Sequence, residues 1–493
     1  MVEITIDPVT RIEGHLNIKV ELEENRFTDA WTSHSLFRGF EEILQGRDPR
    51  DAIYIASRIC GVCYTSHGIA AALALDQAMR VKPPPLGTLL RVLTQYAEWL
   101  YDHLLILFAL EGPDYGPPFG RLEELATLKG KGYLEALKMS RLAREATAVW
   151  GGKMPHQATF VPGGITEFPD TRKFANFTYR LLEVKRWIDD YMIPLMDKFY
   201  DSYKDELTDS GEREANLLSY GVFDDETLNP QNRMMKPGVI INGNLTATNL
   251  YDEIAPKIAE YVTHSWYTED SAGEPTRTKV PVPQYTGLQK DGKYSWCKAP
   301  RWDDNVVEVG PLARMWSTAL QDGGKIQTDA GVWSPPKKPD TIERIYARGY
   351  EAALVATKLI DKLYELLDLV NRGEREVFQP FSIPESSEGY GLTEAARGAL
   401  GHWVKVENKK IARYQVITPT TWNGSPRDNQ GRRGPIEEAL ANTVVKNTDP
   451  TLDAVRVVRA FDPCIACAVH VLDGSKVSTR HIEVFGDIVR PQR

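Results

Sequence analysis

Hydrophobic and polar residues alternate near the start of the chain, over residues 3–33. Leu16, Ile18 and Val20, for example, occupy every second position. A period of two is typical of strands that have one buried face. The pattern therefore predicts a small N-terminal sheet, with a turn near Glu24.

Helical patterns dominate much of the rest of the chain. They cover about 52–150 with a break at the prolines 83–85, then 170–205 and 340–372, whereas 206–340 is rich in loop-forming residues and 403–418 alternates like a hairpin. These periods predict an α+β fold that is predominantly helical, with small N-terminal and C-terminal sheets. No repeat or long linker divides the chain, so we expect one intertwined unit over residues 1–493.

Composition narrows the class of protein. The chain has 493 residues, 42% of them hydrophobic, so it can bury a large core. Its net charge is −9 and its cations are dispersed, which gives no electrostatic reason to expect nucleic acid binding. The N-terminus has no signal-peptide pattern, and no stretch reaches the ~18 apolar residues of a membrane span. The compartment is therefore left open, and we expect membrane association or export only with a partner subunit.

Four of the five cysteines form two Cys-x-x-Cys pairs at opposite ends of the chain: Cys60 with Cys63, and Cys464 with Cys467. This spacing suits a structural zinc ion, a catalytic transition-metal site or redox-active thiols. The spacing alone leaves all three open. The economical interpretation is one four-thiolate site that joins the two ends of the chain. The sequence indicates no role for Cys297.

The residues around each pair help to decide among these three kinds of site. The first pair lies in Arg-Ile-Cys-Gly-Val-Cys-Tyr-Thr-Ser-His, residues 58–67, and the second in Asp-Pro-Cys-Ile-Ala-Cys-Ala-Val-His, residues 462–470. His67 follows Cys63 by four residues, so on a helix it would point back toward the sulfur site as a donor beside the metal ligands.

With these motifs, the chain resembles the large, catalytic subunit of nickel–iron hydrogenases. Further blocks in the same order carry the resemblance over the whole chain: 7–15, 37–41, 46–50, 153–156, 308–314, 397–403 and 419–423. The resemblance implies that all four thiolates bind nickel, Cys60 and Cys464 terminally and Cys63 and Cys467 as bridges to iron. It also implies cyanide and carbon monoxide ligands on the iron.

The resemblance assigns several residues to the pocket around that centre. Arg397 and Thr420 would donate hydrogen bonds to the two cyanides, and Leu400 and Pro419 would form apolar walls. Asp462 would join Arg397 above the metals.

Two departures from the family pattern concern the same pocket. Ala396 stands where the family commonly has proline before the pocket arginine, which loosens one wall. A further acidic partner of that arginine is expected near residue 111, where Glu111 and Asp114 are the candidates.

Two further roles are implied. Glu13 would take the proton that heterolytic H₂ cleavage leaves on the Cys464 thiolate. Glu41, the carbonyl of Val416 and His470 would form a buried magnesium site, for which a carboxylate and waters are suitable ligands.

The implied activity is the reversible cleavage of H₂ into protons and electrons, in the uptake direction, by an enzyme; the alternative is an H₂-sensing regulatory subunit. This chain lacks the cysteines for an iron–sulfur cluster, so an iron–sulfur small subunit is expected as partner. Nickel-insertion factors and a maturation endopeptidase that removes residues 471–493 are implied, and oligomers of the heterodimer are compatible with this assignment.

Overall fold

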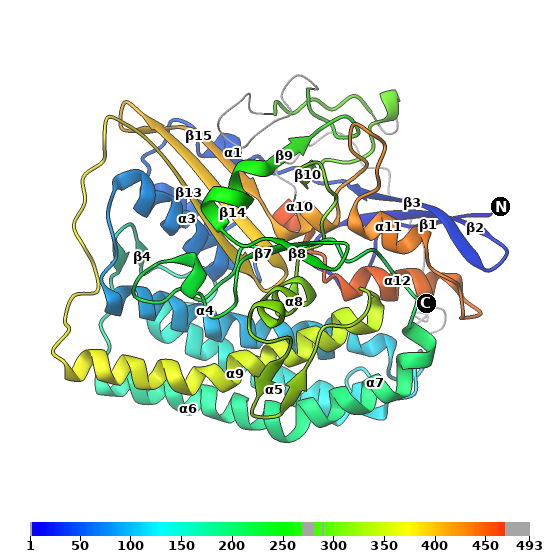
Figure 1. Ribbon diagram of the computed structural model, residues 1–493, viewed down its shortest axis with the longest axis horizontal. Coiled ribbons are helices and arrows are strands. Elements are labelled where there is room, and N and C mark those ends of the chain that lie inside the picture. Colours follow the sequence, from blue (N-terminus) through cyan, green and yellow to red (C-terminus); the bar gives the residue numbers. More distant parts are fainter. Residues whose placement is uncertain (1, 269–280, 288–289, 469–493) are drawn as a thin grey trace, which may run out of the picture.

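The computed structural model describes residues 2–268, 281–287 and 290–468. Its N-terminal sheet is formed by β1 (Val2–Ile6), β2 (Leu16–Glu23) and β3 (Arg26–His34), which are antiparallel in that order. This sheet confirms the prediction from the alternating pattern, and it projects from one end of the molecule (Figure 1).

Long helices form the body of the molecule. They are α3 (Tyr64–Met79), α4 (Pro85–Leu105), α5 (Lys131–Gly151), α6 (Thr171–Trp187), α7 (Ile193–Leu207) and α9 (Thr341–Asn371). Helices α4, α5, α6 and α9 contact one another and lie along one side (Figure 1). None of the helices described is long and apolar enough to span a membrane.

Local sequence explains where several of these helices begin. Pro85 is the first residue of α4, a position where its missing N–H is not needed. Asp170 caps α6 and Asp340 caps α9, each accepting a backbone hydrogen bond three residues ahead.

The predicted helical stretches are interrupted more often than expected. Residues 112–130 contain only short 3-10 turns between α4 and α5, and a π-helical turn at Ile188–Met192 separates α6 from α7. The middle of the chain contains short strands: β4 (Phe160–Val161), β5 (Gly164–Ile165), β6 (Leu217–Ser219), β7 (Gly238–Ile241), β8 (Asn244–Ala247), β9 (Ile258–Tyr261), β10 (Ala299–Trp302), β11 (Ile326–Thr328) and β12 (Gly331–Trp333).

The C-terminal sheet is larger than the predicted hairpin. Strands β14 (Gly398–Glu407) and β15 (Lys410–Ile417) form that hairpin, and β13 (Ser386–Ala395) pairs with β14 on its other side. Strand β13 does not stand out in the sequence because glycines interrupt its alternating pattern. A Cβ on Gly389 or Gly391 would lie 2.2 Å from Ala74 O or 2.1 Å from Ala70 O, so these glycines let α3 pack directly on the sheet.

The structure also contains shorter helices: α1 (Phe40–Ile43), α2 (Asp51–Ser57), α8 (Pro311–Gln321), α10 (Pro419–Asn423), α11 (Pro435–Ala441), α12 (Pro450–Ala460) and α13 (Ile465–Ala468). The largest hydrophobic cluster extends from Phe40 to Cys467 and contains all four paired cysteines. Both ends of the chain therefore contribute to one buried core.

Candidate metal centre

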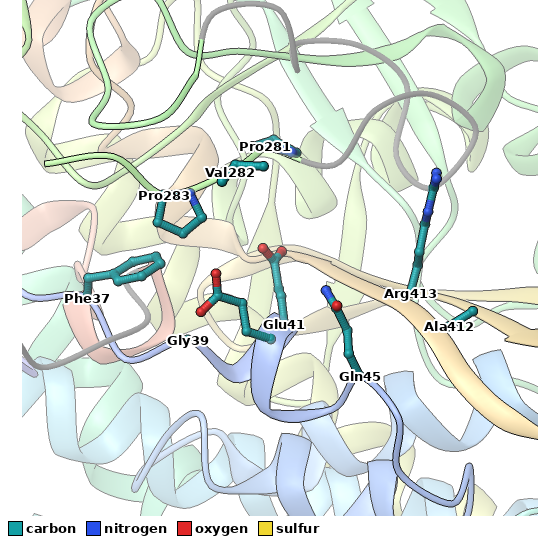
Figure 2. Close-up of a pocket in the computed structure, with 10 residues that line it drawn as sticks. Phe37, Gly39, Glu41, Gln45, Pro281, Val282, Pro283, Ala412 and Arg413 are labelled. Carbon is teal, nitrogen blue, oxygen red and sulfur yellow. The ribbon is translucent and has the colours of Figure 1, made fainter.

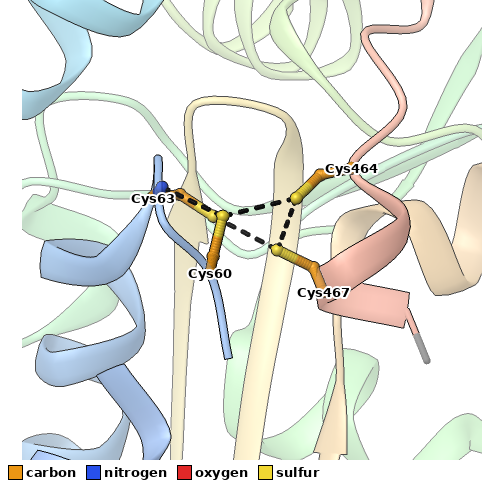
Figure 3. A group of neighbouring side chains, drawn as sticks. All are labelled: Cys60, Cys63, Cys464 and Cys467. Carbon is orange, nitrogen blue, oxygen red and sulfur yellow. Dashed lines mark hydrogen bonds between the residues drawn. The ribbon is translucent and has the colours of Figure 1, made fainter. Parts of the chain in front are cut away.

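Four sulfur atoms from the two ends of the chain meet in this core. We call Cys60 and Cys63 the N-terminal sulfur pair, and Cys464 and Cys467 the C-terminal sulfur pair. The four Sγ atoms all lie within 4.8 Å of one another, and the side chains are buried. Between the pairs, Cys60 Sγ lies 3.3 Å from Cys464 Sγ, and Cys63 Sγ lies 3.4 Å from Cys467 Sγ (Figure 3). The predicted four-sulfur site is therefore present.

The N-terminal sulfur pair lies in the loop between α2 and α3. The backbone N–H groups of Val62 and Cys63 lie 3.2 and 3.3 Å from Cys60 Sγ and donate to it. Donors of this kind stabilise a thiolate, which is the form that binds metals.

The C-terminal sulfur pair flanks the start of α13 and is held by distant segments. The N–H of Cys464 donates to Thr420 Oγ1 at 2.9 Å, and the N–H of Ile465 donates to the Glu13 carbonyl at 2.7 Å. The Glu13 carboxylate accepts from the N–H of Ala466 at 3.0 Å, and its Oε2 lies 3.1 Å from Cys464 Sγ. Glu13 thus contacts both the backbone and a sulfur of this pair.

Gly14 allows the Glu13 segment to lie this close. Its φ is +85°, and a Cβ there would lie 2.9 Å from both Ala466 N and Ile465 Cβ. Burial is the main cause that raises the pKa of the Glu13 carboxyl, and the nearby Cys60 adds to it. A buried carboxyl with a raised pKa beside a sulfur atom is suited to accept and release protons.

Arg38 connects the two sulfur pairs through the backbone. Its Nη2 donates to the carbonyls of Ile59 and Ala466. These residues immediately precede Cys60 and Cys467, so one guanidinium fixes the two segments relative to each other.

Arg397 lies in the turn between β13 and β14 and is only 2% exposed. Its Nη1 donates to Asp102 Oδ2 at 2.8 Å, and its Nη2 lies 3.0 Å from Asp462 Oδ1. The structure thus brings together Arg397 and Asp462 as expected. The further acidic partner is Asp102, within α4, and the expectation of Glu111 or Asp114 was wrong.

The two rejected candidates pair with other arginines. Glu111 Oε2 lies 3.6 Å from Arg348 Nη1, and Asp114 accepts from Arg459 Nη1 at 2.7 and 2.9 Å. Both follow the end of α4, beyond the part of that helix that faces Arg397.

His67 is buried in α3 and belongs to a hydrogen-bonded row of side chains. Its Nδ1 lies 3.0 Å from His402 Nε2, and His402 Nδ1 lies 2.8 Å from Tyr414 Oη. Burial lowers the pKa of His67 to about 4, so its ring is neutral at physiological pH. Its Nε2 has no hydrogen-bond partner among the described residues, and the expected contact with a metal-bound sulfur stays a prediction.

The residues expected to form the apolar walls are buried. Leu400, in β14, is fully buried in the same cluster as the cysteines, and Ala396 is buried beside Arg397. Pro419 is the first residue of α10 and is buried next to Thr420.

The residues expected to bind magnesium are placed only in part. Glu41 Oε1 accepts from the N–H of Val416 at 2.9 Å, so the carboxylate lies against this strand, whereas His470 lies outside the described residues. Lys298 Nζ lies 3.3 Å from Glu41 Oε1 and 3.3 Å from Glu260 Oε1. Burial raises the pKa of Glu260 to about 7.

A pocket of about 460 Å³ opens beside Glu41. Phe37 and Pro283 lie on one side of Glu41 and Gln45 and Arg413 on the other (Figure 2). Glu41, the acidic side chain expected to bind magnesium, therefore lines this pocket.

The sulfur site fits a transition-metal centre by its chemistry. Burial raises the pKa of Cys464, and it raises the pKa of Cys467 to about 12. Thiolates this deeply buried need compensating cations, and Arg397 is already paired with two carboxylates. Soft sulfur ligands bind nickel, iron and zinc well.

Several residues of this site were not identified from sequence. Asp102 and His402 lie in apolar segments, and a polar residue within an apolar helix or strand is the signal that would have found them. Lys298 follows Cys297 in a loop-rich region without a regular period, so no pattern indicated it.

The chain is similar to known proteins over nearly its whole length. A family model described as nickel-dependent hydrogenase matches residues 38–122 and 120–470. A second, described as HoxL-like, matches residues 3–30.

Individual relatives agree with these matches. The chain is 37% identical to the periplasmic [NiFeSe] hydrogenase large subunit of Desulfomicrobium baculatum, covering 96% of this chain and 95% of the relative. It is 32% identical to the hydrogenase-1 large chain of Citrobacter freundii, covering 96% of each. An uptake hydrogenase large subunit of Afipia carboxidovorans is 30% identical, also over 96% of each.

The fold is shared as well. The structure of the Ni-Fe-Se hydrogenase from D. vulgaris Hildenborough in the reduced state superposes with a TM-score of 0.85 at 34% identity, covering 95% of this chain and 100% of that one. Although some of these relatives are named for selenium, all four sulfur positions here are cysteine.

Proposed function

The chain belongs to the family of nickel-dependent hydrogenases, and on this premise we propose that it is the catalytic subunit of a hydrogenase that works mainly in the direction of H₂ uptake. The observation that carries the proposal is the carboxylate of Glu13 at 3.1 Å from Cys464 Sγ, within a buried set of four sulfurs. A structural metal site has no need of such a proton acceptor.

The four cysteines would hold nickel, and Cys63 and Cys467 would also hold iron. When bound, this centre supplies the heterolytic cleavage of H₂ and accepts the two electrons. The four sulfurs converge from two backbone segments that Arg38 joins, so the chain fixes the ligand positions.

Proton transfer would use Cys464 and Glu13. A proton held at Cys464 Sγ is within hydrogen-bond distance of Glu13 Oε2, and burial has raised the pKa of that carboxyl. The carboxyl is therefore able to take the proton and release it again outward. The N–H of Ala466 keeps the same oxygen in place.

Diatomic ligands on the iron would occupy the pocket formed by Arg397, Thr420, Leu400 and Pro419. Thr420 Oγ1 already accepts from the N–H of Cys464, so its own proton is left to be donated elsewhere. Arg397 supplies a buried guanidinium for the second cyanide, and Leu400 supplies an apolar surface for carbon monoxide.

A magnesium ion would be held by Glu41, Val416 and His470. The support is the buried Glu41 carboxylate, which lies against Val416 and beside a pocket. Lys298 lies close enough to form an ion pair with the Glu41 carboxylate.

Electrons would leave through an iron–sulfur small subunit. The relatives are named as large subunits or large chains, and this chain has one cysteine beyond the four of the site. An iron–sulfur cluster needs about four cysteines, so this chain cannot ligate one as well. The match to a relative named as an uptake hydrogenase supports the proposed direction.

Residues 471–493 would be removed after nickel insertion by a maturation endopeptidase. The support is that the family match ends at residue 470, so the last 23 residues lie beyond the shared sequence.

The test is to purify the native complex and measure H₂ oxidation with an artificial electron acceptor, and H₂ production with an artificial donor. We expect both activities, with oxidation the faster at neutral pH. A nickel-loaded complex without either activity would contradict the proposed catalysis, and faster production would contradict the uptake direction alone.

A further inference from the structure

The helix that follows the N-terminal sulfur pair begins without an ordinary cap. Cys63 is the N-cap residue of α3, and its side chain makes no capping hydrogen bond because Sγ points toward the other sulfurs. The first N–H groups of a helix have no partner within the helix itself. A metal ligand at the N-cap position therefore leaves these donors to be satisfied by another residue.

Glu98, in α4, satisfies them. Its Oε1 accepts from the N–H of Thr65 at 2.6 Å, and its Oε2 accepts from the N–H of Ser66 at 2.9 Å. The hydroxyl of Ser66 also contacts Oε2. The Glu98 side chain is completely buried, so water does not compete for these hydrogen bonds.

A second residue of α4 holds the same loop. Tyr101 follows Glu98 by three positions, on the same face of the helix, and its hydroxyl donates to the Val62 carbonyl. Asp102, the next residue, binds Arg397. One face of α4 therefore contacts two parts of the site. These are the backbone next to the N-terminal sulfur pair and the Arg397 side chain.

We infer that Glu98 is a positioning residue for the metal centre: its carboxylate replaces the missing N-cap of α3 and so sets the direction of the Cys60–Cys63 segment. Glu98 touches neither sulfur nor substrate, and it acts through the backbone of Thr65 and Ser66. This inference rests on the proposed nickel–iron centre.

The alternative is that Glu98 only stabilises the packing of α3 on α4. The chain offers a matched control for this alternative. Asp76 is a buried carboxylate of α3 that pairs with Arg91 of α4 at 2.6 Å and accepts from the N–H of Gly163 at 2.6 Å. It joins the same two helices at the end of α3 far from the sulfurs.

The experiment compares the Glu98→Ala, Glu98→Gln and Asp76→Ala variants as purified complexes. The readouts are the melting temperature, nickel per chain, the infrared bands of the iron-bound diatomic ligands and the rate of H₂ oxidation. Glu98→Ala is expected to shift the infrared bands and to lower the rate about tenfold, since the cysteine segment is no longer fixed. Glu98→Gln is expected to restore both in part because its amide oxygen still accepts one N–H.

Asp76→Ala is expected to lower the melting temperature as much as Glu98→Ala while leaving the infrared bands and the rate per nickel unchanged. Wild-type bands and rate in Glu98→Ala would overturn the inference and leave Glu98 a purely structural role. If Glu98→Ala does not fold, Glu98→Asp gives the same decision, because its shorter carboxylate cannot reach both N–H groups.

Failure of the proposed function would be seen separately. A wild-type complex without nickel or without diatomic bands would refute the nickel–iron centre itself. If the infrared bands of every Glu98 variant match those of the wild type, only the positioning role is refuted.

Discussion

The two sulfur pairs are held in different ways. The N-terminal pair lies just before α3, a helix of 16 residues that packs against β13, whereas the C-terminal pair lies at the start of α13, of which the structure describes four residues. The contacts that fix this segment come from distant parts of the chain. Glu13 and Thr420 supply those contacts.

This difference indicates how structure and proton transfer are combined. The residues that fix the N-terminal pair, Glu98 and Tyr101, contact its backbone side and take no part in the chemistry we propose. At the C-terminal pair, Glu13 both fixes the backbone and faces a sulfur. We therefore compare substitutions that cause the same loss of stability. Those near the C-terminal pair should lower the catalytic rate more than those near the N-terminal pair.

The largest effect is expected from removing a ligand. Cys60→Ala and Cys464→Ala should each lower the rate of H₂ oxidation more than about a thousandfold. This corresponds to an increase of about 4 kcal/mol in activation free energy. Nickel per chain, measured by elemental analysis, should fall in both. As a control, Cys297→Ala should keep nickel and activity, because Cys297 lies in another core cluster. Retained nickel and activity in Cys60→Ala would show that the two pairs do not share one centre.

Glu13→Gln is expected to come next. It removes the proton acceptor but keeps the size of the side chain, so the rate of H₂ oxidation should fall about 10²- to 10⁴-fold. Nickel content should stay at the wild-type level. Glu23→Gln, an exposed glutamate in β2, is the control and should behave as wild type. A wild-type rate in Glu13→Gln would remove Glu13 from the proton route.

Gly14→Ala should have an intermediate effect. The positive φ costs about 1–2 kcal/mol for a residue with a Cβ, and the added carbon would also push against α13. Gly46→Ala is a matched control, since Gly46 has a φ of +76° with no atom within 4 Å of the added carbon. Both variants should lose thermal stability, but only Gly14→Ala should lose activity. Equal activities would mean that the contact between Gly14 and α13 is unimportant for catalysis.

The smallest effects should come from single hydrogen bonds. Thr420→Val leaves the buried N–H of Cys464 without its acceptor, and Tyr101→Phe leaves the Val62 carbonyl without its donor, each at about 1–3 kcal/mol of unfolding free energy. Denaturant unfolding measures these losses. At a similar loss of stability, Thr420→Val should lower the rate of H₂ oxidation more, and the reverse order would contradict the comparison.

Much of the fold could be predicted from sequence where the pattern is regular. The N-terminal sheet, α6 and α9 follow from their hydrophobic periods. Strand β13 could not be found, because Gly389 and Gly391 serve the packing of α3 and break the alternation. Hydrophobic periodicity indicates which face of an element is buried. Glycines that allow close backbone contact between elements do not follow this period.

The site shows the same limit. The Cys-x-x-Cys pairs predicted the four sulfurs because their spacing reflects local geometry. Asp102 pairs with Arg397 across 295 positions of sequence, and nothing local marks that pairing. The acidic partner was expected after the helix, at Glu111 or Asp114, whereas Asp102 within the helix accepts from the arginine.

The most direct test of the account is the metal content of the native complex, measured together with the intact mass of this chain. We predict near-stoichiometric nickel and an intact mass that corresponds to a chain ending at residue 470. A chain of that mass that contains zinc in place of nickel would contradict the account.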